Sequence, residues 1–522
     1  MTPTNHWLQA RAHTTPHALA LIFGQTRWDY AELNRRTNSL AAHLQAEGIQ
    51  PGQRVAALLP NSPLYVCLIH AVARLGAVLV PLNGRLTPPE LAWQIEYAAC
   101  HWLVTDQELA IANCQLLPIT EEIIERPYTS SLIHKSQFIM DNYQAILFTS
   151  GTSGQPKAVP LTFANHFYSA LASAYRIGTL PHDLWLSCLP LYHVGGLAVI
   201  FRSCLYGTAV DLHPRFDLDT INHSLNTKPI TLISLVPTML YRLLQSRTHW
   251  PASLRLILLG GAAAAPELIE RANALPRTVG SSQMPVASRQ KPVGSREDGG
   301  EVQTAVPLVS PTYGLTEASS QVATMLPAAA AQKPGSVGRP LLFTTVQIVA
   351  EQGHECPPGT VGEIVVTGPT VMSGYLSKAD LTDGEPEKKA RSGSQQILSG
   401  LATGDMGYLD EDGDLWVVQR RSDLIVSGGE NVYPAEIEAV IRGITGVTAV
   451  AVVGLPHPEW GQQVAAAVVL HKEAELSEAD LLTYCRPRLA GYKLPRHILF
   501  VEQLPLTASG KIARTAVTQL FM

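Results

Sequence analysis

The sequence predicts an α/β fold, with a large N-terminal domain built on covered, mostly parallel sheets and a small, mobile α+β C-terminal domain. The chain has 522 residues, which is too long for one simple core. Short apolar runs alternate with helical patterns through its first half, whereas after about residue 419 compact helices and longer apolar strands follow. We therefore expect domains at 1–418 and 425–522, joined by a hinge at 419–424.

The N-terminal region begins with a helix at 29–47, for which Asp29 and Glu32 form a capping box and Gly48 provides the end. The strand RVAALLP, a helix around 62–75 and the strand AVLVPL follow. This alternation is typical of parallel sheets that are covered on both faces. Further apolar strands are predicted at 184–191, 231–238 and 254–261.

The C-terminal region contains a helix in NVYPAEIEAVIRGI, buried strands in TAVAVVGL and QVAAAVVLH, and a second helix that starts at a capping box of Ser477 and Asp480. Two polar segments, 277–308 and 383–399, interrupt the large domain. Both are rich in Gly, Ser and charge and cannot bury much surface, so we interpret them as tolerated surface insertions.

Composition excludes several classes of function. The formal net charge is −5 and no basic block occurs, which argues against nucleic acid or an anionic membrane as the main partner. The most apolar run, 65–82, is interrupted by His70, Arg74 and Gly76 and is too polar for an integral membrane segment, and the start lacks the apolar core of a signal peptide. Seven scattered cysteines without a C-x-x-C pair indicate reduced thiols. We expect a cytoplasmic protein, and a homo-oligomer is compatible with the sequence.

The stretch ILFTSGTSGQPKAVPLT, 146–162, has the composition of a phosphate-binding loop. Glycines let backbone N–H groups converge, hydroxyls add donors and the lysine adds charge. The residues concerned are Thr149, Ser150, Gly151, Thr152, Ser153, Gly154 and Lys157. Their spacing does not match a Walker loop, and Ala158 stands where that loop has a magnesium-binding hydroxyl. Taken alone, the segment is also compatible with a plain Gly/Ser surface turn.

Four further segments favour nucleotide chemistry over that plain turn. PTYGLTEASSQ, 311–321, supplies Thr316 and Glu317, a hydroxyl and a carboxylate suited to Mg²⁺ and phosphate oxygens. Asp405 is expected in a turn, where a carboxylate can accept from both hydroxyls of a ribose. Arg420 lies at the domain boundary, and Lys511 follows a Ser-Gly near the C-terminus.

Together, these five segments resemble the adenylate-forming superfamily of acyl-CoA synthetases, aryl-CoA ligases, luciferases and peptide-synthetase adenylation domains, over nearly the whole chain. The resemblance implies that a carboxylic acid reacts with ATP to form an acyl-adenylate, from which coenzyme A then displaces AMP. It implies Mg²⁺, bound through phosphate by Glu317, and it places Thr316 and Glu317 at the α-phosphate. Lys511 would bridge the attacking carboxylate and the α-phosphate as a catalytic residue.

The resemblance also assigns the nucleotide-binding and CoA-binding positions. Thr149 to Gly154 and Lys157 would hold the leaving phosphates, and Asp405 and Arg420 would bind the ribose. The adenine slot would consist of Gly260, Gly261 and Ala262 with Pro311, Thr312, Tyr313 and Gly314. The pantetheine tunnel would be lined by Ser427, Gly428, Gly429, Glu430 and Asn431. The small domain would rotate between the two steps about a pivot two residues after the arginine, where this chain has Ser422 followed by Asp423.

The identity of the acid is addressed by HVGGLAVIFRSCLYG, 193–207. His193 would gate the tunnel and act in catalysis, although a structural role fits the sequence equally well. Arg202 lies in an otherwise apolar stretch, so it requires an anionic partner: either a protein carboxylate or a second carboxylate on the substrate. The segments around it most resemble the o-succinylbenzoate–CoA ligase family of menaquinone and phylloquinone synthesis. That resemblance implies a dicarboxylic substrate, with Ser234 and Thr238 as further pocket donors.

Three other interpretations remain open at the level of sequence. The chain could be a ligase for another aryl or short acyl acid, since such relatives share every nucleotide motif. It could load a carrier protein, although the sequence shows no carrier domain after Lys511. It could also be a non-catalytic ATP-binding protein, although Glu317, Asp405, Arg420 and Lys511 are all intact. A luciferase-type oxygenase is compatible with the motifs, but nothing in the sequence requires it.

Overall fold

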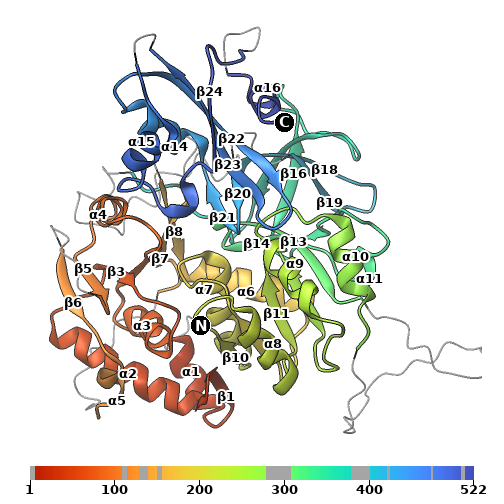
Figure 1. The fold of residues 1–522 in the computed structure, drawn as a ribbon. Helices are drawn as coiled ribbons and strands as arrows, with labels where there is room; N and C mark the ends of the chain where they lie inside the picture. The colour runs from red at the N-terminus through yellow and green to blue at the C-terminus, as the bar shows by residue number, and fades with distance from the viewer. Residues whose placement is uncertain are drawn as a thin grey trace, which may run out of the picture.

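The structure, a computed structural model, describes residues 6–107, 114–127, 139–149, 156–277, 307–377, 400–419, 424–471, 474–506 and 512–522. Two large sheets form the N-terminal part of the chain, as Figure 1 shows in red to green, and the C-terminal part lies above them in blue. A four-stranded sheet, drawn in green to blue-green, lies beside both parts.

The first large sheet has six strands in the order β6-β5-β3-β4-β7-β8, and all its pairings are parallel except that of β7 with β8. Its strands are β3 (Arg54–Leu58), β4 (Val78–Pro81), β5 (Trp102–Thr105), β6 (Gln115–Pro118), β7 (Tyr143–Thr149) and β8 (Lys157–Thr162). The helices of this region are α1 (Trp7–Thr14), α2 (Tyr30–Ala46), α3 (Pro63–Arg74), α4 (Pro88–Tyr97) and α5 (Glu121–Glu125).

The second large sheet has nine strands in the order β15-β14-β13-β12-β11-β9-β10-β1-β2. The neighbouring strands β13, β12, β11, β9, β10 and β1 pair in parallel, whereas β2 at one edge and β14 and β15 at the other pair antiparallel. Its strands are β1 (Leu19–Phe23), β2 (Thr26–Asp29), β9 (Leu184–Ser187), β10 (Ala209–Leu212), β11 (Leu232–Leu235), β12 (Leu256–Leu259), β13 (Val309–Leu315), β14 (Ser320–Thr324) and β15 (Arg339–Pro340). The helices of this region are α6 (Phe163–Ile177), α7 (Val194–Tyr206), α8 (Leu218–Thr227), α9 (Pro237–Ser246), α10 (Pro266–Ala274) and α11 (Pro327–Ala330).

Both large sheets are covered on their two faces, as the apolar strands predicted. Along β3, Val55 and Ala57 pack into the core that contains α2 and α3, whereas Ala56 packs into a second core with α4. Along β11, Leu232 joins the first of these cores and Ile233 joins a third core with α8, α9 and α10. Successive side chains point to opposite faces of a strand, so a strand buried on both faces is apolar at every position.

The third sheet is fully antiparallel, with the order β16-β17-β18-β19. Its strands are β16 (Thr345–Val349), β17 (Gly362–Thr367), β18 (Leu401–Leu409) and β19 (Leu415–Gln419). The alternating helices and strands of the sequence did not predict this sheet, whose strands pair in chain order, each antiparallel to the next.

The C-terminal part has an antiparallel sheet, β21-β20-β23-β22, to which β24 adds in parallel. Its elements are β20 (Ile425–Ser427), β21 (Glu430–Val432), α14 (Pro434–Arg442), β22 (Val447–His457), β23 (Gly461–Leu470), α15 (Glu478–Cys485), the 3₁₀ turn η3 (Gly491–Lys493), β24 (His497–Phe500) and α16 (Arg514–Gln519). A separate core of Ile425, Val432, Ile437 and Ile441 with β22 and β23 supports an independently folding α+β unit. The boundaries 1–418, 419–424 and 425–522 stay a prediction.

The individual caps differ in how well the sequence predicted them. Asp29 accepts a hydrogen bond from the backbone of Glu32 at 2.8 Å and caps α2, but Glu32 does not complete the expected capping box. The Glu32 carboxylate binds Arg35 and Arg36, so it is engaged on the helix surface. The capping box of Ser477 and Asp480 is confirmed at α15.

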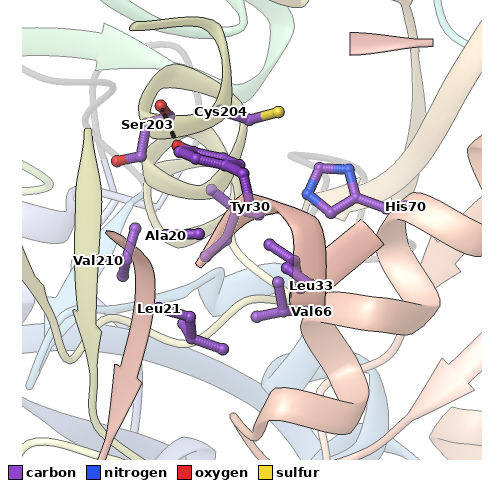
Figure 2. Close-up of a pocket in the computed structure, with 10 residues that line it drawn as sticks. Ala20, Leu21, Tyr30, Leu33, Val66, His70, Ser203, Cys204 and Val210 are labelled. Carbon is purple, nitrogen blue, oxygen red and sulfur yellow. Dashed lines mark hydrogen bonds between the residues drawn. The ribbon is translucent and has the colours of Figure 1, made fainter. Parts of the chain in front are cut away.

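One small cavity lies in the N-terminal core, between β1, α2, α3 and α7. Its volume is about 10 Å³, roughly enough for one water molecule. Figure 2 shows the Tyr30 hydroxyl at its edge, 2.8 Å from the carbonyl oxygen of Ser203. The lining residues include none of the predicted site residues, so this cavity belongs to the packing of the core.

The state of the cysteines and the character of the helices bear on two expectations from the sequence, reduced thiols and no integral membrane segment. All seven cysteines are free thiols, and burial raises the pKa of Cys67, Cys188 and Cys204 to about 12. Among the described residues, none of the helices combines the length and apolar character that crossing a bilayer would require.

Candidate active site

The structure describes two of the predicted phosphate-binding residues, Thr149 and Lys157, which are neighbours across two strands. Thr149 ends β7 and pairs with Lys157, which begins β8. The Lys157 ammonium lies 4.7 Å from the centre of the Tyr375 ring, and the Tyr375 hydroxyl donates to Oε1 of Glu317 at 2.7 Å. A cation, a phenol and a carboxylate therefore lie together beside the start of β8. Ser150 to Gly154 lie outside the described residues.

Backbone hydrogen bonds hold this cluster in place. Glu317 belongs to the short 3₁₀ helix η2 (Thr316–Ala318), which directly follows β13. Its carbonyl oxygen accepts from the backbone N–H of Met372 at 2.8 Å, and the carbonyl of Ala158 accepts from that of Leu376 at 3.0 Å. The irregular segment that carries Tyr375 thus bonds to both of the segments that carry Lys157 and Glu317.

The predicted ribose carboxylate is buried beside the predicted adenine slot. The Tyr313 hydroxyl donates to Oδ2 of Asp405 at 2.7 Å, and Asp405 is only 4% exposed. The expectation that Asp405 lies in a turn is wrong, because Asp405 is part of β18. Gly404, with φ of +74°, and a register shift after Met406 bend this strand, which is why its sequence resembles a turn. Arg420 lies outside the described residues.

The residues of the predicted adenine slot come from neighbouring strands. β12 and β13 are parallel, with Leu259 beside Pro311, so Gly260 and Thr312 are adjacent. A Cβ atom on Gly260 would lie 2.7 Å from Cγ2 of Thr312, and one on Gly314 would lie 1.8 Å from the carbonyl oxygen of Ser320. These close approaches require glycine. Ala262 follows in the loop between β12 and α10.

The predicted tunnel residues lie against this slot. Gly428 and Gly429 form the turn between β20 and β21, and both have positive φ, at +62° and +86°. Cβ atoms built on Gly261 and Gly429 would lie 3.0 and 3.2 Å from the two methyl groups of Val236. Val236 is therefore sandwiched between the adenine slot and the C-terminal turn. Asn431 is exposed on β21.

Glu430 follows that turn and is the centre of a charged cluster. The Glu430 side chain is 6% exposed, its Oε1 lies 2.9 Å from Nη1 of Arg85, and its Oε2 lies 3.2 Å from Nε2 of His193. The Tyr192 hydroxyl lies 3.4 Å from the same carboxylate. Burial alone would raise the pKa of Glu430, but His193 and Arg85 hold it at about 2. The predicted gating histidine and the predicted tunnel therefore meet directly.

Arg202, on α7, is buried among neutral groups. It is 2% exposed, its Nη2 donates to Oγ of Ser169 at 3.2 Å, and its buried Nε has no hydrogen-bond partner. No protein carboxylate within the described ranges forms an ion pair with it. Burial lowers the pKa of Arg202, and burial together with Arg202 lowers the pKa of His166 to about 3. The alternative of a protein ion pair is thus absent from the part of the chain that the structure describes.

Ser169 connects Arg202 with the cluster of Lys157, Tyr375 and Glu317. Its hydroxyl donates to the carbonyl oxygen of Ser319 at 2.6 Å, and Ser319 directly follows η2, which carries Glu317. Of the other predicted pocket donors, Ser234 accepts from the Trp185 indole at 3.0 Å and keeps its own proton to donate. The roles of Ser234 and Thr238 stay predictions. Ser422, Asp423 and Lys511 lie outside the described residues, as does all of 383–399 and most of 277–308.

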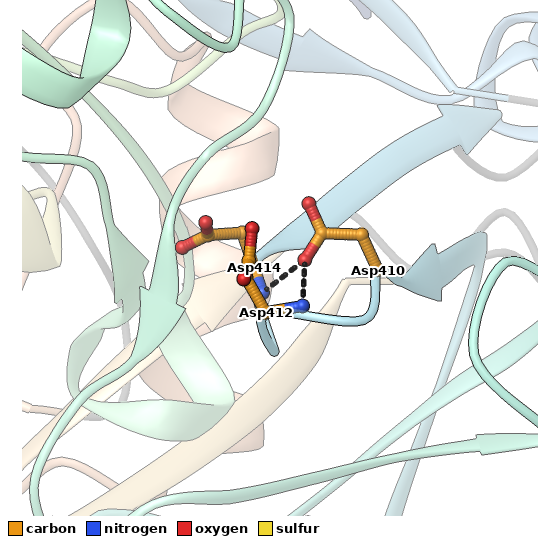
Figure 3. A group of neighbouring side chains, drawn as sticks. All are labelled: Asp410, Asp412 and Asp414. Atoms are coloured by element: carbon orange, nitrogen blue, oxygen red, sulfur yellow. Dashed lines mark hydrogen bonds between the residues drawn. The ribbon is translucent and has the colours of Figure 1, made fainter.

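Three acidic residues in and beside the turn between β18 and β19 lie close enough together to hold a metal ion, but a lysine binds all three. Figure 3 shows Asp410, Asp412 and Asp414 with their carboxylates gathered. The Lys333 ammonium lies 2.8, 2.7 and 2.6 Å from an oxygen of each. These hydrogen bonds raise the pKa of Lys333. The group therefore ties the turn to the segment after α11, and Glu317 remains the candidate for Mg²⁺.

Comparison with known proteins identifies the family. A family model described as AMP-binding enzyme matches residues 8–282 and 296–376, and one described as AMP-binding enzyme C-terminal domain matches 436–511. The chain belongs to the AMP-binding enzyme family. Within this family it is 38% identical to a 2-succinylbenzoate–CoA ligase of Bacillus cereus, over 99% of this chain and 98% of that protein.

Solved structures of the family agree over the whole length. An o-succinylbenzoate CoA synthetase of Bacillus subtilis, a double mutant bound with the product analogue OSB-NCoA, superposes with a TM-score of 0.84 at 35% identity, covering 98% of this chain and 97% of that one. The same synthetase in complex with the acyl-adenylate OSB-AMP gives a TM-score of 0.68 at the same identity and coverage. With ATP and magnesium the TM-score is again 0.68, with 98% of each chain covered.

Several residues of the site were not found from the sequence. Tyr375, Ser169 and Arg85 carry no local signal, because a tyrosine, a serine or an arginine in a segment without a motif has many ordinary roles. Their contacts depend on segments distant in sequence: Arg85 and Glu430 are 345 positions apart. Only the assembled fold brings them together.

Proposed function

We propose that this AMP-binding enzyme is a 2-succinylbenzoate–CoA ligase, which forms an acyl-adenylate from the acid and ATP and then transfers the acyl group to coenzyme A. Identity of 38% over nearly the full length of a ligase of this name supports the assignment. The observation that carries it is Arg202, a buried guanidinium without a carboxylate partner among the described residues.

The buried charge of Arg202 selects for a second anionic group on the substrate. An isolated buried cation is costly, and a substrate carboxylate would remove that cost at the moment of binding. 2-Succinylbenzoate has two carboxylates, of which the succinyl group is activated and the aromatic one is free to bind Arg202. A monocarboxylic acid would leave the guanidinium unpaired, which disfavours acyl or aryl acids with one carboxylate.

In the first half-reaction, the substrate carboxylate attacks the α-phosphate of ATP and pyrophosphate leaves. Lys157 and the loop from Thr149 to Gly154 would hold the leaving phosphates, and Lys511 would neutralise the carboxylate and the α-phosphate as they meet. Asp405 and Arg420 would hold the ribose. Glu317 fits a magnesium ion because the Tyr375 bond occupies only Oε1 of its carboxylate, and the ion would spread the phosphate charge.

In the second half-reaction, the thiolate of coenzyme A attacks the acyl carbonyl and AMP leaves. The turn of Gly428 and Gly429 lies against Val236 and would line the path of the pantetheine arm. The bond between His193 and Glu430 turns the imidazole toward the carboxylate, which would keep the ring out of that path. The C-terminal part would rotate about Ser422 and Asp423 between the two steps.

We further propose that the product serves menaquinone or phylloquinone synthesis in the cytoplasm. The test of the proposed function is a screen of carboxylic acids with ATP, Mg²⁺ and coenzyme A. We expect acid-dependent pyrophosphate release and thioester formation with 2-succinylbenzoate, and at least about tenfold less with benzoate or a short fatty acid, the loss expected from one unpaired charge. Faster turnover with a monocarboxylic acid would reject the substrate, and absence of ATP–pyrophosphate exchange with every acid would reject the activity.

A further inference from the structure

A buried lysine of the C-terminal part is bonded to a helix of the N-terminal part. Lys493 is 4% exposed and lies in η3. Its ammonium is 2.6 Å from Oε1 of Glu90 in α4 and 2.6 Å from Oε1 of Glu436 in α14. Figure 1 shows α4 directly below the C-terminal elements α14 and α15. One bond of the lysine therefore lies within the C-terminal part and the other crosses to the N-terminal part.

Both glutamates lie in the first turn of their helices, where the helix dipole favours a negative charge. Oε2 of Glu90 also accepts from the backbone N–H of Thr87 at 2.7 Å and from its hydroxyl at 2.8 Å. If Lys493 moved away, Glu90 would keep its helix cap and Lys493 would keep Glu436. Each group would thus keep a hydrogen-bond or ion-pair partner among the described residues, so this contact can open at a lower cost than an ordinary buried ion pair.

The 3₁₀ turn η3, which carries Lys493, is also connected to the predicted tunnel residues. The Arg85 guanidinium lies 4.7 Å from the centre of the Tyr492 ring, and Arg85 also binds Glu430. The contacts thus run from Glu90 through Lys493, Tyr492 and Arg85 to the carboxylate beside the turn of Gly428 and Gly429. Movement of Lys493 would therefore change the contacts that hold the turn of Gly428 and Gly429.

The chain superposes unequally on two structures of the same synthetase. The chain superposes with a TM-score of 0.84 on the synthetase with a product analogue, and with 0.68 on the same synthetase with OSB-AMP, at equal coverage. The arrangement described here is therefore closer to that of the structure with the product analogue.

We propose that Lys493 is a positioning residue for the coenzyme A-dependent step: its bond to Glu90 holds the turn of Gly428 and Gly429 against Val236. The bond opens when the C-terminal part turns for adenylation. This inference rests on the proposed function, since it requires two half-reactions with different arrangements. The contact therefore stabilises one of the two arrangements and leaves the chemistry of adenylation to other residues.

The test compares Glu90→Gln with the wild type in each half-reaction. Glutamine at position 90 keeps a side-chain acceptor for the cap of α4 but removes the charge that binds Lys493. We expect ATP–pyrophosphate exchange within about twofold of wild type, and about tenfold slower thioester formation from enzyme-bound acyl-adenylate after coenzyme A is added, the effect of losing one charged contact. Glu96→Gln, at an exposed position of the same helix, should behave as wild type in both assays.

A double variant provides the second measurement. Lys493→Gln should slow the coenzyme A step, and adding Glu90→Gln should slow it little further, because both changes remove one contact. Unchanged thioester formation in Glu90→Gln, equal losses in both half-reactions, or fully additive effects would each overturn the inference. If the wild type shows ATP–pyrophosphate exchange with another acid but not with 2-succinylbenzoate, the proposed substrate is wrong. The variants are then compared with that other acid.

Discussion

Arg202 illustrates what one residue can determine about substrate choice. A guanidinium remains charged in nearly every protein environment. A buried guanidinium without a carboxylate partner therefore favours binding of an anion at that position. Ser169 supplies one neutral hydrogen bond, which orients the group without neutralising it. The link from Ser169 to Ser319 then sets this charge relative to Glu317. In the proposed function, these residues would hold the second carboxylate of the substrate at a fixed position relative to Glu317.

Replacing Arg202 by glutamine should therefore impair binding of the acid more than the chemistry. We expect KM for 2-succinylbenzoate to rise at least about tenfold to a hundredfold, as for loss of a charged hydrogen bond, with KM for ATP nearly unchanged. Steady-state kinetics of both substrates would measure this. Arg215→Gln, at an exposed position, is the control. An unchanged KM for the acid would remove the basis for a dicarboxylic substrate.

At the scale of elements, short turns place backbone where side chains would not fit. The hairpin of β20 and β21 turns at Gly428 and Gly429, which both have positive φ, and it reaches Val236 because Gly429 has no side chain at the contact. After β12, the chain comes close to Thr312 of β13 at Gly260, which likewise has no side chain there. The proposed nucleotide and pantetheine sites therefore depend on glycines in two different parts of the chain.

Gly429→Ala should slow the coenzyme A-dependent step selectively. Its new Cβ would lie 3.2 Å from Cγ2 of Val236, which is tighter than ordinary van der Waals contact, so the turn or the Val236 side chain must shift by a few tenths of an ångström. We expect thioester formation to fall about tenfold, with ATP–pyrophosphate exchange retained, for a displacement that costs roughly 1 kcal/mol or more. Gly359→Ala is the matched control, because Gly359 has a similar φ of +78° but open space around it. Equal effects of the two substitutions would mean that backbone strain, and not the contact, matters.

At the scale of the whole molecule, the core of the N-terminal part contains neutral histidines. Burial, with Arg74 nearby, lowers the pKa of His70 to about 3, and burial beside Arg202 does the same for His166. In the unfolded chain both would titrate near the ordinary value of 6.5. Between these pH values the unfolded chain binds more protons than the folded one, so acid stabilises the unfolded state.

Stability should accordingly be complete above pH 6.5 and fall as the pH decreases toward 3. At pH 5, each histidine should lower the free energy of unfolding by about 2 kcal/mol relative to neutral pH. Urea unfolding at pH 7.5 and 5 would measure the difference. In His70→Gln, the decrease in the free energy of unfolding between pH 7.5 and 5 should be smaller by about 2 kcal/mol, the contribution of one histidine. The same loss in wild type and variant would show that other groups dominate the acid response.

Local sequence determined much of this protein. Apolar strands without alternation required sheets covered on both faces, and the glycine-rich loop, Glu317, Asp405 and the C-terminal hairpin were recognisable as short motifs because their chemistry lies in neighbouring residues. Only the tertiary structure decided that Asp405 lies in a strand, that Lys333 fills the acidic turn, and that Arg202 has no carboxylate partner among the described residues. It also decided the pairing of Arg85 with Glu430 and of Lys493 with Glu90. These are contacts between residues hundreds of positions apart, whose energies depend on burial and distance, and neither quantity is encoded in any short segment.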